Sequence, residues 1–264
     1  MKGAILISGA GSGIGKATRE KFKSEGSRVF SLDIRFSEEC EDSIAADVTS
    51  PEELIAEGER LKAEGVQLDA IVIAAGIHTM ASLAEADPEV LKRVIDVNLI
   101  GAMNTVRAFH PLLKKSGRVI IVTSEVATYA PMPFNGLYNI SKTALECYAD
   151  ALRQELNLIG QKVIAVRPGA VETPLAKGSA NSTQILAQST ELYKNEAKHF
   201  CTMVAKFTSP PIAPAKIADI IFKAATAKRP KIAYSKNRHP GLVMLSILPK
   251  PLQCFIIKTL LKRK

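Results

Sequence analysis

The stretch ILISGAGSGIGKA, residues 5–17, places four glycines between a short apolar run and a helical stretch. Gly9, Gly13 and Gly15 follow the spacing G-x-x-x-G-x-G, whereas the stricter G-x-G-x-x-G is not met because Ile14 stands where its last glycine would fall. Glycines let such a turn tighten and let backbone amides approach a pyrophosphate at the start of a helix. The stretch predicts a strand, a nucleotide-binding turn and a helix, with a plain glycine-rich turn as the alternative.

The rest of the chain repeats this alternation of short apolar runs and longer amphipathic stretches. Such alternation is typical of parallel strands joined by right-handed helical crossovers. We therefore expect an α/β fold, a Rossmann-type doubly wound parallel sheet of about seven strands, forming a single domain over residues 1–238. Strands are expected at 4–8, 28–33, 70–76, 118–124 and 162–169, with weaker ones at 43–48 and 230–235, and helices at about 13–25, 51–64, 88–115, 138–158 and 214–226.

Residues 175–213 break the alternation, and their sequence predicts one or two helices followed by the proline-containing loop SPPIAP, residues 209–214. An insertion of this kind commonly covers a site, so we expect a substrate lid. Core packing is an equally good interpretation of its apolar positions, because several fall near helical spacing. These positions are Ile185, Leu186, Leu192, Phe200, Met203, Val204 and Phe207.

The net charge of +9 is concentrated near the C-terminus. Residues 1–219 hold 24 basic and 26 acidic residues, whereas residues 220–264 hold 11 basic residues and no acidic one. Because the body is nearly neutral and shows no recognition motif, binding to nucleic acid is disfavoured. Residues 239–264 are interpreted as a basic amphipathic C-terminal extension, whose two apolar pieces are both shorter than the ~20 residues that span a bilayer.

The last part of this extension, residues 252–264, places apolar side chains on one helical face with basic side chains around it. This pattern is typical of a helix lying on an anionic membrane surface, which would make the protein peripheral to the membrane. The same pattern would suit an arm that packs on a partner subunit, and both interpretations stay open. The apolar face consists of Leu252, Phe255, Ile256 and Leu260.

The cysteines are far apart, form no C-x-x-C pair, and are expected to be reduced thiols. No opening stretch is typical of a signal peptide, so a cytoplasmic location is expected. The histidines beyond residue 100 show no ligand spacing, and no metal site is expected. The cysteines are Cys40, Cys147, Cys201 and Cys254.

Asp33 ends the second expected strand, 18 residues after Gly15. An acid at this place accepts hydrogen bonds from the ribose hydroxyls and repels a 2′-phosphate, which favours NAD over NADP. Arg35 lies two residues further on and could pair with that phosphate, so NADP remains the alternative. A solvated strand end without a ligand is the other interpretation of Asp33.

The stretch LYNISK, residues 137–142, places Tyr138 four residues before Lys142, so that both side chains lie on one face of a helix. Hydride transfer to or from a carbonyl carbon requires a proton transfer at its oxygen. A free tyrosine has a pKa of about 10, and a nearby ammonium group lowers it. We expect Tyr138 to act as general acid/base with Lys142 tuning it, although the spacing alone also occurs by chance.

Together these motifs resemble the short-chain dehydrogenase/reductase family over residues 5–175. SGAGSGIG (8–15) is similar to the family's T-G-x-x-x-G-I-G loop, IAAG (73–76) takes the place of N-N-A-G with both asparagines replaced, and RPGAVETP (167–174) is similar to P-G-x-x-x-T. With Asp33 added, the resemblance implies cofactor contacts at Gly9, Ser12, Gly13, Ile14, Gly15, Asp33, Asp47, Val48, Ala75, Gly76, Tyr138, Lys142, Val171 and Thr173.

The resemblance also implies a catalytic tetrad. DVNLIG supplies Asn98 and VTSEVA supplies Ser124, which join Tyr138 and Lys142. Asn98 is then expected to hold a proton-relay water, Ser124 to hydrogen-bond the substrate oxygen, and Lys142 to grip the nicotinamide ribose. Ser124 lies 14 residues before Tyr138, one more than the commonest spacing in the family. The structural alternatives are a strand-end cap for Ser124 and a helix kink or cap for Asn98.

The expected function is an oxidoreductase that transfers a hydride between NAD(H) and an apolar secondary alcohol or ketone of steroid, retinoid or long-chain type. An NADP-dependent ketoreductase and a catalytically silent nucleotide-binding regulatory or membrane-associated protein are the alternatives. The helices at 99–115 and 139–158 resemble the pair that builds dimers and tetramers in the family, so a homodimer or homotetramer is expected. His78 either lines the substrate pocket or is a loop residue without chemistry.

Overall fold

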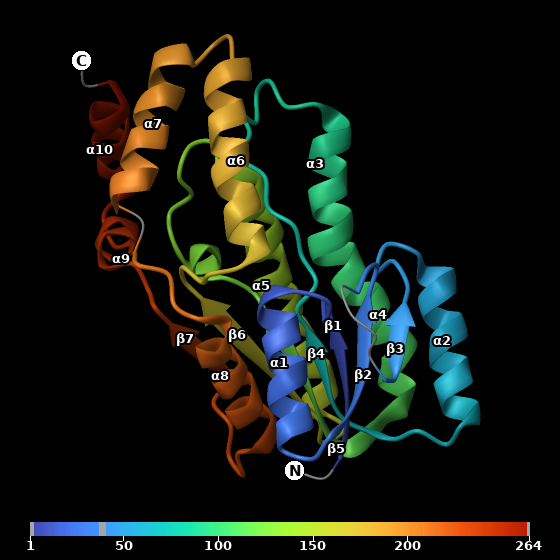
Figure 1. Cartoon of the computed structure of the whole chain (residues 1–264). Helices are drawn as coiled ribbons and strands as arrows, with labels where there is room; N and C mark the ends of the chain where they lie inside the picture. The colour runs from blue at the N-terminus through green and yellow to red at the C-terminus, as the bar shows by residue number, and fades with distance from the viewer. Residues whose placement is uncertain (1–2, 37–40, 208, 263–264) are drawn as a thin grey trace.

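The computed structural model describes residues 3–36, 41–207 and 209–262, and its centre is a parallel sheet (Figure 1). In the described residues this sheet has seven strands in the order β3-β2-β1-β4-β5-β6-β7. The order reverses between β1 and β4, which makes the sheet doubly wound and confirms the predicted single Rossmann-type domain. The strands are β1 (Ala4–Ser8), β2 (Arg28–Asp33), β3 (Ser43–Ala45), β4 (Leu68–Ile73), β5 (Leu113–Val122), β6 (Lys162–Pro168) and β7 (Ala233–Lys236).

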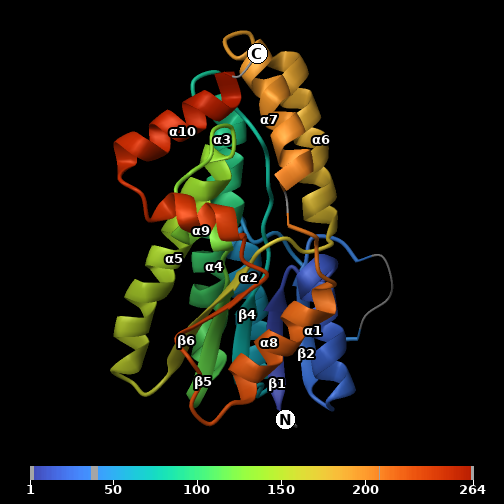
Figure 2. The same ribbon diagram turned by 90° about the vertical axis from the view of Figure 1, so that its left-hand side faces the viewer.

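Helices cover both faces of the sheet. They are α1 (Gly13–Ser24), α2 (Pro51–Ala63), α3 (Pro88–Ile95), α4 (Gly101–Phe109), α5 (Gly136–Asn157), α6 (Pro174–Ser189), α7 (Lys194–Phe207), α8 (Pro214–Thr226), α9 (Pro240–Ser246) and α10 (Lys250–Lys262). Helices α1 and α8 lie together on one face, whereas α2, α4 and α5 lie on the other (Figure 2).

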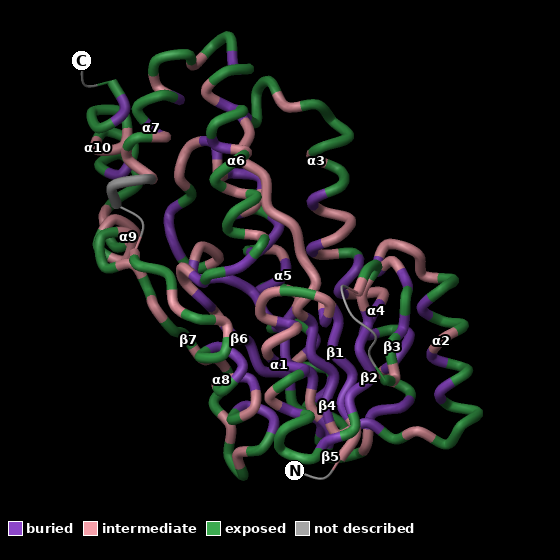
Figure 3. The backbone as a smooth tube through the Cα atoms, viewed as in Figure 1, coloured by how far each residue is buried: buried purple, intermediate pink, exposed green. Residues whose placement is uncertain are grey.

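Each face of the sheet has its own hydrophobic core, because successive side chains of a strand point to opposite faces. Leu6 packs toward α2, α4 and α5 in a cluster that includes Phe109. Its neighbour Ile7 packs with Phe22 of α1 and Ile221 of α8. Figure 3 shows the central strands as the most continuously buried part of the chain.

The prediction of one continuous helix over residues 88–115 was wrong in both the length and the continuity of the helix. It is interrupted by a π-helical turn at Asp96–Ile100, and it ends near Pro111, which cannot continue a helix. Gly101 follows this turn, at a point where an added Cβ would lie 2.6 Å from the Val48 side chain. The π turn therefore lies just before the point where the helix packs closely against Val48, in the segment after β3. Asn98 is one of the residues of this turn.

The predicted strand bounds also needed correction. Strand β4 begins at Leu68 and ends at Ile73, because the next backbone N–H groups turn toward Ser8 on β1. Strand β5 begins at Leu113, since its first residue pairs with Leu68. Strand β3 occupies only the first part of its predicted range, whereas β7 begins later than predicted, at Ala233, and ends at Lys236.

The expected insertion contains two helices, α6 and α7, which stand above the carboxyl ends of the strands (Figure 1). Leu186 and Phe200 are buried between these helices, and Met203 and Val204 pack against them. Ile185 and Leu192 are exposed, whereas the side chain of Phe207 lies outside the described part of the structure. Core packing therefore accounts for the buried members of the apolar set.

The C-terminal extension folds back onto this insertion. Leu261 of α10 is buried in the same cluster as Phe200 of α7, so the inner side of α10 packs on its own chain. The division of the chain into residues 1–238 and 239–264 stays a prediction. Within residues 3–36, 41–207 and 209–262, no helix is long and apolar enough to cross a membrane.

Candidate active site

The residues expected to bind cofactor and substrate lie near the carboxyl ends of β1 to β6, below α6 and α7 (Figure 1). This edge contains the reversal between β1 and β4, where open α/β sheets bind their ligands. Five segments far apart in the sequence therefore meet: the glycine-rich turn, Asp33, the loop after β4, the π turn and the start of α5.

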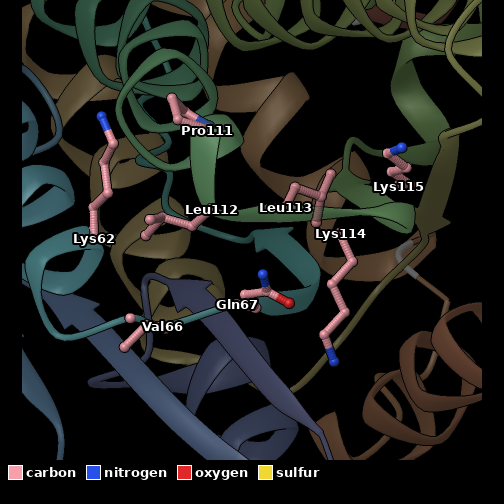
Figure 4. Close-up of a pocket in the computed structure, with 9 residues that line it drawn as sticks. Lys62, Val66, Gln67, Pro111, Leu112, Leu113, Lys114 and Lys115 are labelled. Atoms are coloured by element: carbon pink, nitrogen blue, oxygen red, sulfur yellow. The ribbon is translucent and has the colours of Figure 1, made fainter.

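A separate cavity of about 400 Å³ lies at the opposite edge, where β4 and β5 begin (Figure 4). Its Lys114 donates to Asp69 at 2.9 Å, and its Lys62 pairs with Glu59 at 3.4 Å. None of the predicted site residues lines this cavity, so it is not part of the candidate site. Its lining residues are Lys62, Gly65, Val66, Gln67, Pro111, Leu112, Leu113, Lys114 and Lys115.

The glycine-rich turn can be built only from residues without a side chain. Gly9 and Gly13 have φ values of +72° and +51°, in the left-handed region that favours glycine. A Cβ on Gly15 would lie 2.0 Å from the Gly9 carbonyl oxygen. Ser12 occupies the N-cap position of α1, and Ile14 packs into the core below it. The turn thus presents backbone amides at a helix N-terminus, as a pyrophosphate requires.

The loop after β6 meets this turn from the other side. A Cβ on Gly13 would lie 3.2 Å from Cγ2 of Thr173, so the two segments are in near contact. The Thr173 hydroxyl caps α6 by accepting from the Ala176 N–H at 3.2 Å. Val171 is buried beside it. The structure therefore brings Thr173 to the glycine-rich turn, and contacts of Val171 and Thr173 with the nicotinamide stay a prediction.

Asp33 is held at the same turn. Its Oδ2 accepts from the Gly11 N–H at 2.8 Å, and its Oδ1 accepts from the Arg35 N–H at 3.2 Å. A Cβ on Gly11 would lie 2.9 Å from this carboxylate. Gly11, the fourth glycine of the turn, therefore leaves room for both the Asp33 carboxylate and the Arg35 carbonyl oxygen.

Asp47 and Val48 lie between β3 and α2. The Asp47 Oδ1 accepts from both the N–H and the hydroxyl of Thr49, each at 2.8 Å. The Val48 carbonyl accepts from Asn104 at 3.1 Å. Asp47 is thus fixed by local bonds and Val48 by a bond from α4, and both follow the strand that pairs with Asp33.

The loop after β4 joins the cofactor side to the catalytic side. The Ser8 Oγ accepts from the N–H groups of Ala74 and Ala75 at 3.2 and 3.4 Å, which ties this loop to β1. A Cβ on Gly76 would lie 3.2 Å from Asn98 Oδ1 and 3.4 Å from Lys142 Nζ. Gly76 therefore leaves room for two of the predicted catalytic residues.

Asn98 is fully buried, and its side chain is bound on both sides. Its Oδ1 accepts from the Ile77 N–H at 2.7 Å, while its Nδ2 donates to the Ile77 carbonyl and to Ser141 Oγ, both at 2.9 Å. The side-chain amide hydrogens are therefore occupied by the protein. Ser141, which lies next to Lys142 in the sequence, was missed because nothing in a helical stretch marks it as a partner.

Ser124 and Tyr138 face each other across the site. Burial raises the pKa of Tyr138 to about 12, and the interaction with the Ser124 side chain opposes this rise only in part. Thr123 points elsewhere and donates to the Val166 carbonyl at 3.3 Å. The short 3-10 turn at Glu125–Thr128 lies within the one-residue-longer segment between Ser124 and Tyr138.

Lys142 is almost fully buried one helical turn after Tyr138. Its Nζ lies 5.8 Å from the centre of the Tyr138 ring and donates to the Val122 carbonyl at 3.2 Å. Burial lowers the pKa of Lys142 to about 8. The expectation that the Lys142 ammonium lowers the pKa of Tyr138 therefore does not hold here, because burial raises that pKa.

A family model described as short chain dehydrogenase matches residues 3–184. The chain belongs to the short-chain dehydrogenase family. Members of this family are oxidoreductases that use NAD or NADP, act on small substrates and are typically oligomeric.

Curated relatives place this short-chain dehydrogenase among diverse oxidoreductases. A probable oxidoreductase, EphD, of Mycobacterium tuberculosis is 29% identical over 263 residues, covering 94% of this chain and 44% of the relative. A 1-hydroxy-2-glutathionyl-2-methyl-3-butene dehydrogenase of Rhodococcus is 35% identical over 133 residues, covering 50% of this chain and 59% of the relative. The chain thus spans less than two thirds of both. A 3-ketodihydrosphingosine reductase of Bacteroides thetaiotaomicron is 28% identical, covering 86% and 84%.

Solved structures support the fold of the short-chain dehydrogenase. The ligand-free aldohexose dehydrogenase of Thermoplasma acidophilum has a TM-score of 0.75 at 21% identity, covering 95% of this chain and 97% of that one. A Burkholderia cenocepacia short chain dehydrogenase in complex with NADP has a TM-score of 0.73 at 21% identity, covering 97% of each chain.

The sequence left open whether His78 lines the substrate pocket or is a loop residue without chemistry. In the structure it lies beside Tyr138, the candidate catalytic tyrosine. Its ring stands edge-on to the Tyr138 ring with centroids 4.2 Å apart, and its Nε2 lies 2.7 Å from Asn135 Oδ1. Burial lowers the pKa of His78, so the imidazole is neutral at neutral pH. Within the described residues, no group of three or more His, Cys, Asp or Glu side chains could hold a metal ion.

Proposed function

We propose that this short-chain dehydrogenase transfers a hydride between NAD(H) and an apolar secondary alcohol or ketone. The observation that carries the proposal is the grouping of the interacting Tyr138 and Ser124 side chains beside Lys142, whose Nζ lies 5.8 Å from the centre of the Tyr138 ring. Such a pair supplies a proton donor and a second hydrogen bond for one carbonyl oxygen. Asn98 acts as a positioning residue, because it ties the loop at Ile77 to Ser141 on α5.

The protonation states of Tyr138 and Lys142 at neutral pH favour reduction of a carbonyl group. With a pKa of about 12, Tyr138 holds its proton at neutral pH and is ready to donate it to a ketone oxygen. With a pKa of about 8, Lys142 is mainly charged at neutral pH, so it can stabilise the phenolate that remains. Alcohol oxidation needs the reverse transfer and is expected to become faster as the pH rises.

The site residues fit a nicotinamide dinucleotide, because the turn at Gly9 and Gly15 has no room for side chains and exposes backbone amides. When bound, the nicotinamide supplies or accepts the hydride, while the chain controls positions and protons. Lys142 has N–H groups beyond the one given to Val122, which are available for ribose hydroxyls. Asp33 supports NAD, since its carboxylate stands at the turn where a 2′-phosphate would be repelled.

Replacing Asp33 by Ala is expected to weaken NAD binding by about 10- to 100-fold, as for lost hydrogen bonds to a charged group. NADP binding is expected to be unchanged or tighter, since the repulsion is removed. Titration of both cofactors by calorimetry measures the difference. Glu20→Ala, an exposed acid on α1, is the control for the change in charge. Equal losses for both cofactors would contradict the preference for NAD.

His78→Ala is expected to lower kcat about 2- to 10-fold, in line with the ~0.5–1.5 kcal/mol of an aromatic pair. The reason is that the Tyr138 ring loses the edge-on contact that orients it. The binding constant for the cofactor should not change. His78→Phe keeps a ring and should recover most of the rate, whereas equal activity of all three proteins would show that His78 is a loop residue without influence on Tyr138.

The substrate is proposed to be apolar because the surroundings of the site toward the lid are apolar. Met80, Met132 and Tyr193 are only partly buried and pack beside Phe134 and Phe200. The name of the 3-ketodihydrosphingosine reductase of B. thetaiotaomicron supports reduction of a keto group. Steroid, retinoid and long-chain ketones all satisfy these features.

The test is to mix the protein with NADH or NADPH and a panel of apolar ketones, and to follow the absorbance of the reduced cofactor. Consumption of NADH with one or more ketones is the expected result. Tight cofactor binding with no turnover across the panel would instead support the silent nucleotide-binding alternative. Polar sugars serve as controls for the apolar preference.

For the assembly we propose a homodimer or homotetramer built through α4 and α5. Ile140 and Cys147 are exposed on α5, and Ile100 is exposed just before α4. Exposed apolar side chains on neighbouring helices are typical of subunit contacts. A cytoplasmic location is proposed from the absence of disulfides among the described cysteines, which do not include Cys40.

A further inference from the structure

The two C-terminal helices, α9 and α10, form a bent unit that we call the C-terminal elbow (residues 240–262). Its base is anchored next to the candidate site, because the His239 N–H donates to Glu125 Oε2 at 2.8 Å and Arg238 Nε donates to the Tyr129 hydroxyl at 2.9 Å. Its corner is closed by Gln253, whose Nε2 donates to the Leu248 carbonyl at 2.6 Å. The elbow is therefore a fixed part of the fold.

The inner side of the elbow rests on the lid. Leu261 is 5% exposed and packs with Phe200, and Ile257 packs against the same cluster. His199 of α7 forms a hydrogen bond through Nδ1 with the Leu261 carbonyl at 2.9 Å. These contacts determine which face of α10 points outward.

The outer side of the elbow is unusually apolar for an exposed surface. Phe255 is 65% exposed, and Leu252, one helical turn before it, is 43% exposed. Lys258 and Lys262 follow Phe255 at positions i+3 and i+7, so they flank it on the same face. The exposed apolar residues of the elbow are Met244, Ile247, Leu252, Phe255 and Leu260. Figure 2 shows α9 and α10 on one side of the molecule.

The charged side chains around this surface are all positive. From residue 220 to residue 264 the chain holds 11 basic residues and no acidic one, and Lys250, Lys258 and Lys262 of the elbow are all exposed. An apolar surface with basic side chains around it matches the interface of an anionic bilayer, where lipid tails accept the apolar groups and headgroups accept the cations. Two copies meeting through this surface would instead oppose like charges, which is unfavourable.

We propose that the C-terminal elbow docks this short-chain dehydrogenase on an anionic lipid surface, with Phe255 inserted and Lys258 and Lys262 at the headgroups. The docking goes beyond the proposed reaction and does not depend on it. Because the inner side of the elbow packs on α7, docking places the lid helices next to the lipid.

The experiment is sedimentation of the full chain with vesicles of phosphatidylcholine, with and without phosphatidylglycerol. The protein is expected to sediment with the anionic vesicles and to be released by raised salt, since headgroup attraction is screened. Phe255→Ser should lower the partition constant about tenfold, as for loss of one buried aromatic side chain. The double variant Lys258→Glu/Lys262→Glu should abolish the difference between the two vesicle types.

Leu158→Ser is the matched control for the apolar change, since Leu158 is 85% exposed at the end of α5, outside the elbow. Lys62→Glu/Lys115→Glu, at the opposite edge of the sheet, is the control for charge. Thermal unfolding of each variant shows whether it is folded, and no turnover is needed. Absence of binding to anionic vesicles would overturn the proposal. So would a dimer in lipid-free buffer that Phe255→Ser converts to a monomer, because the surface would then be a subunit contact.

Discussion

Tyr138→Phe is expected to lower kcat by about 10²- to 10⁴-fold, the range for loss of a positioned general acid. The substitution removes only the phenolic hydroxyl, which interacts with the Ser124 side chain. The phenylalanine ring keeps the edge-on contact with His78 at 4.2 Å and stays below Lys142. The cofactor dissociation constant should therefore change little, and the loss should appear in kcat for every ketone that the enzyme reduces.

Tyr148→Phe is the matched control, because Tyr148 lies on the same helix and burial raises its pKa to about 12 as well. It is half-buried and outside the candidate site, so its variant should keep full activity. Stopped-flow measurement of reduced-cofactor consumption, with cofactor binding measured separately, distinguishes the two variants. A Tyr138→Phe enzyme with wild-type kcat would remove Tyr138 from the proposed chemistry.

The sheet could be predicted from the sequence because its strands are short apolar runs separated by amphipathic helices. The helix over 88–115 could not, since the π turn at Asp96–Ile100 depends on how closely Gly101 packs against Val48. Contacts between distant segments leave no periodic signal in either one. The same reason explains why the sequence could suggest an apolar face for α10 but not that Leu261 and Ile257 would pack on α7.

Within the candidate site, the sequence predicted which segments would meet but not the electrostatic balance. Spacing places Lys142 one turn after Tyr138, but the pKa of each group depends on burial by the surrounding loops. His78 illustrates the second limit: a single histidine after a turn has no motif, and only the fold brings it against the Tyr138 ring. The site roles themselves remain predictions that the variants above test.

Lys142→Met is expected to abolish most activity while making the protein more stable. Burial lowers the pKa of Lys142 to about 8, from an ordinary value of about 10.4. At neutral pH both folded and unfolded chains carry the proton, so the folded chain bears the cost of a buried charge. At about 1.4 kcal/mol per pKa unit this cost is roughly 3 kcal/mol. Loss of the hydrogen bond to the Val122 carbonyl offsets about 1 kcal/mol of it.

The direction in which the free energy of unfolding changes with pH follows from how many protons the folded and unfolded chains bind. Between pH 8 and about 10.4 the unfolded lysine keeps its proton and the folded one loses it, so the wild-type free energy of unfolding rises with pH in this window. The Met variant lacks this rise, and its advantage of about 2 kcal/mol at pH 7 should shrink toward zero and then reverse as the pH increases. At neutral pH the advantage corresponds to a midpoint of thermal unfolding that is about 5 °C higher.

Calorimetry of wild type and Lys142→Met across this pH window measures both effects, with Lys162→Met as the control for loss of an exposed lysine. The activity of Lys142→Met should fall at least as far as that of Tyr138→Phe, because the phenolate and the ribose both lose their cation. A variant that is less stable than wild type at neutral pH would mean that Lys142 is held as a satisfied structural charge. A more stable but inactive variant would show that the chain keeps a costly buried charge for the reaction.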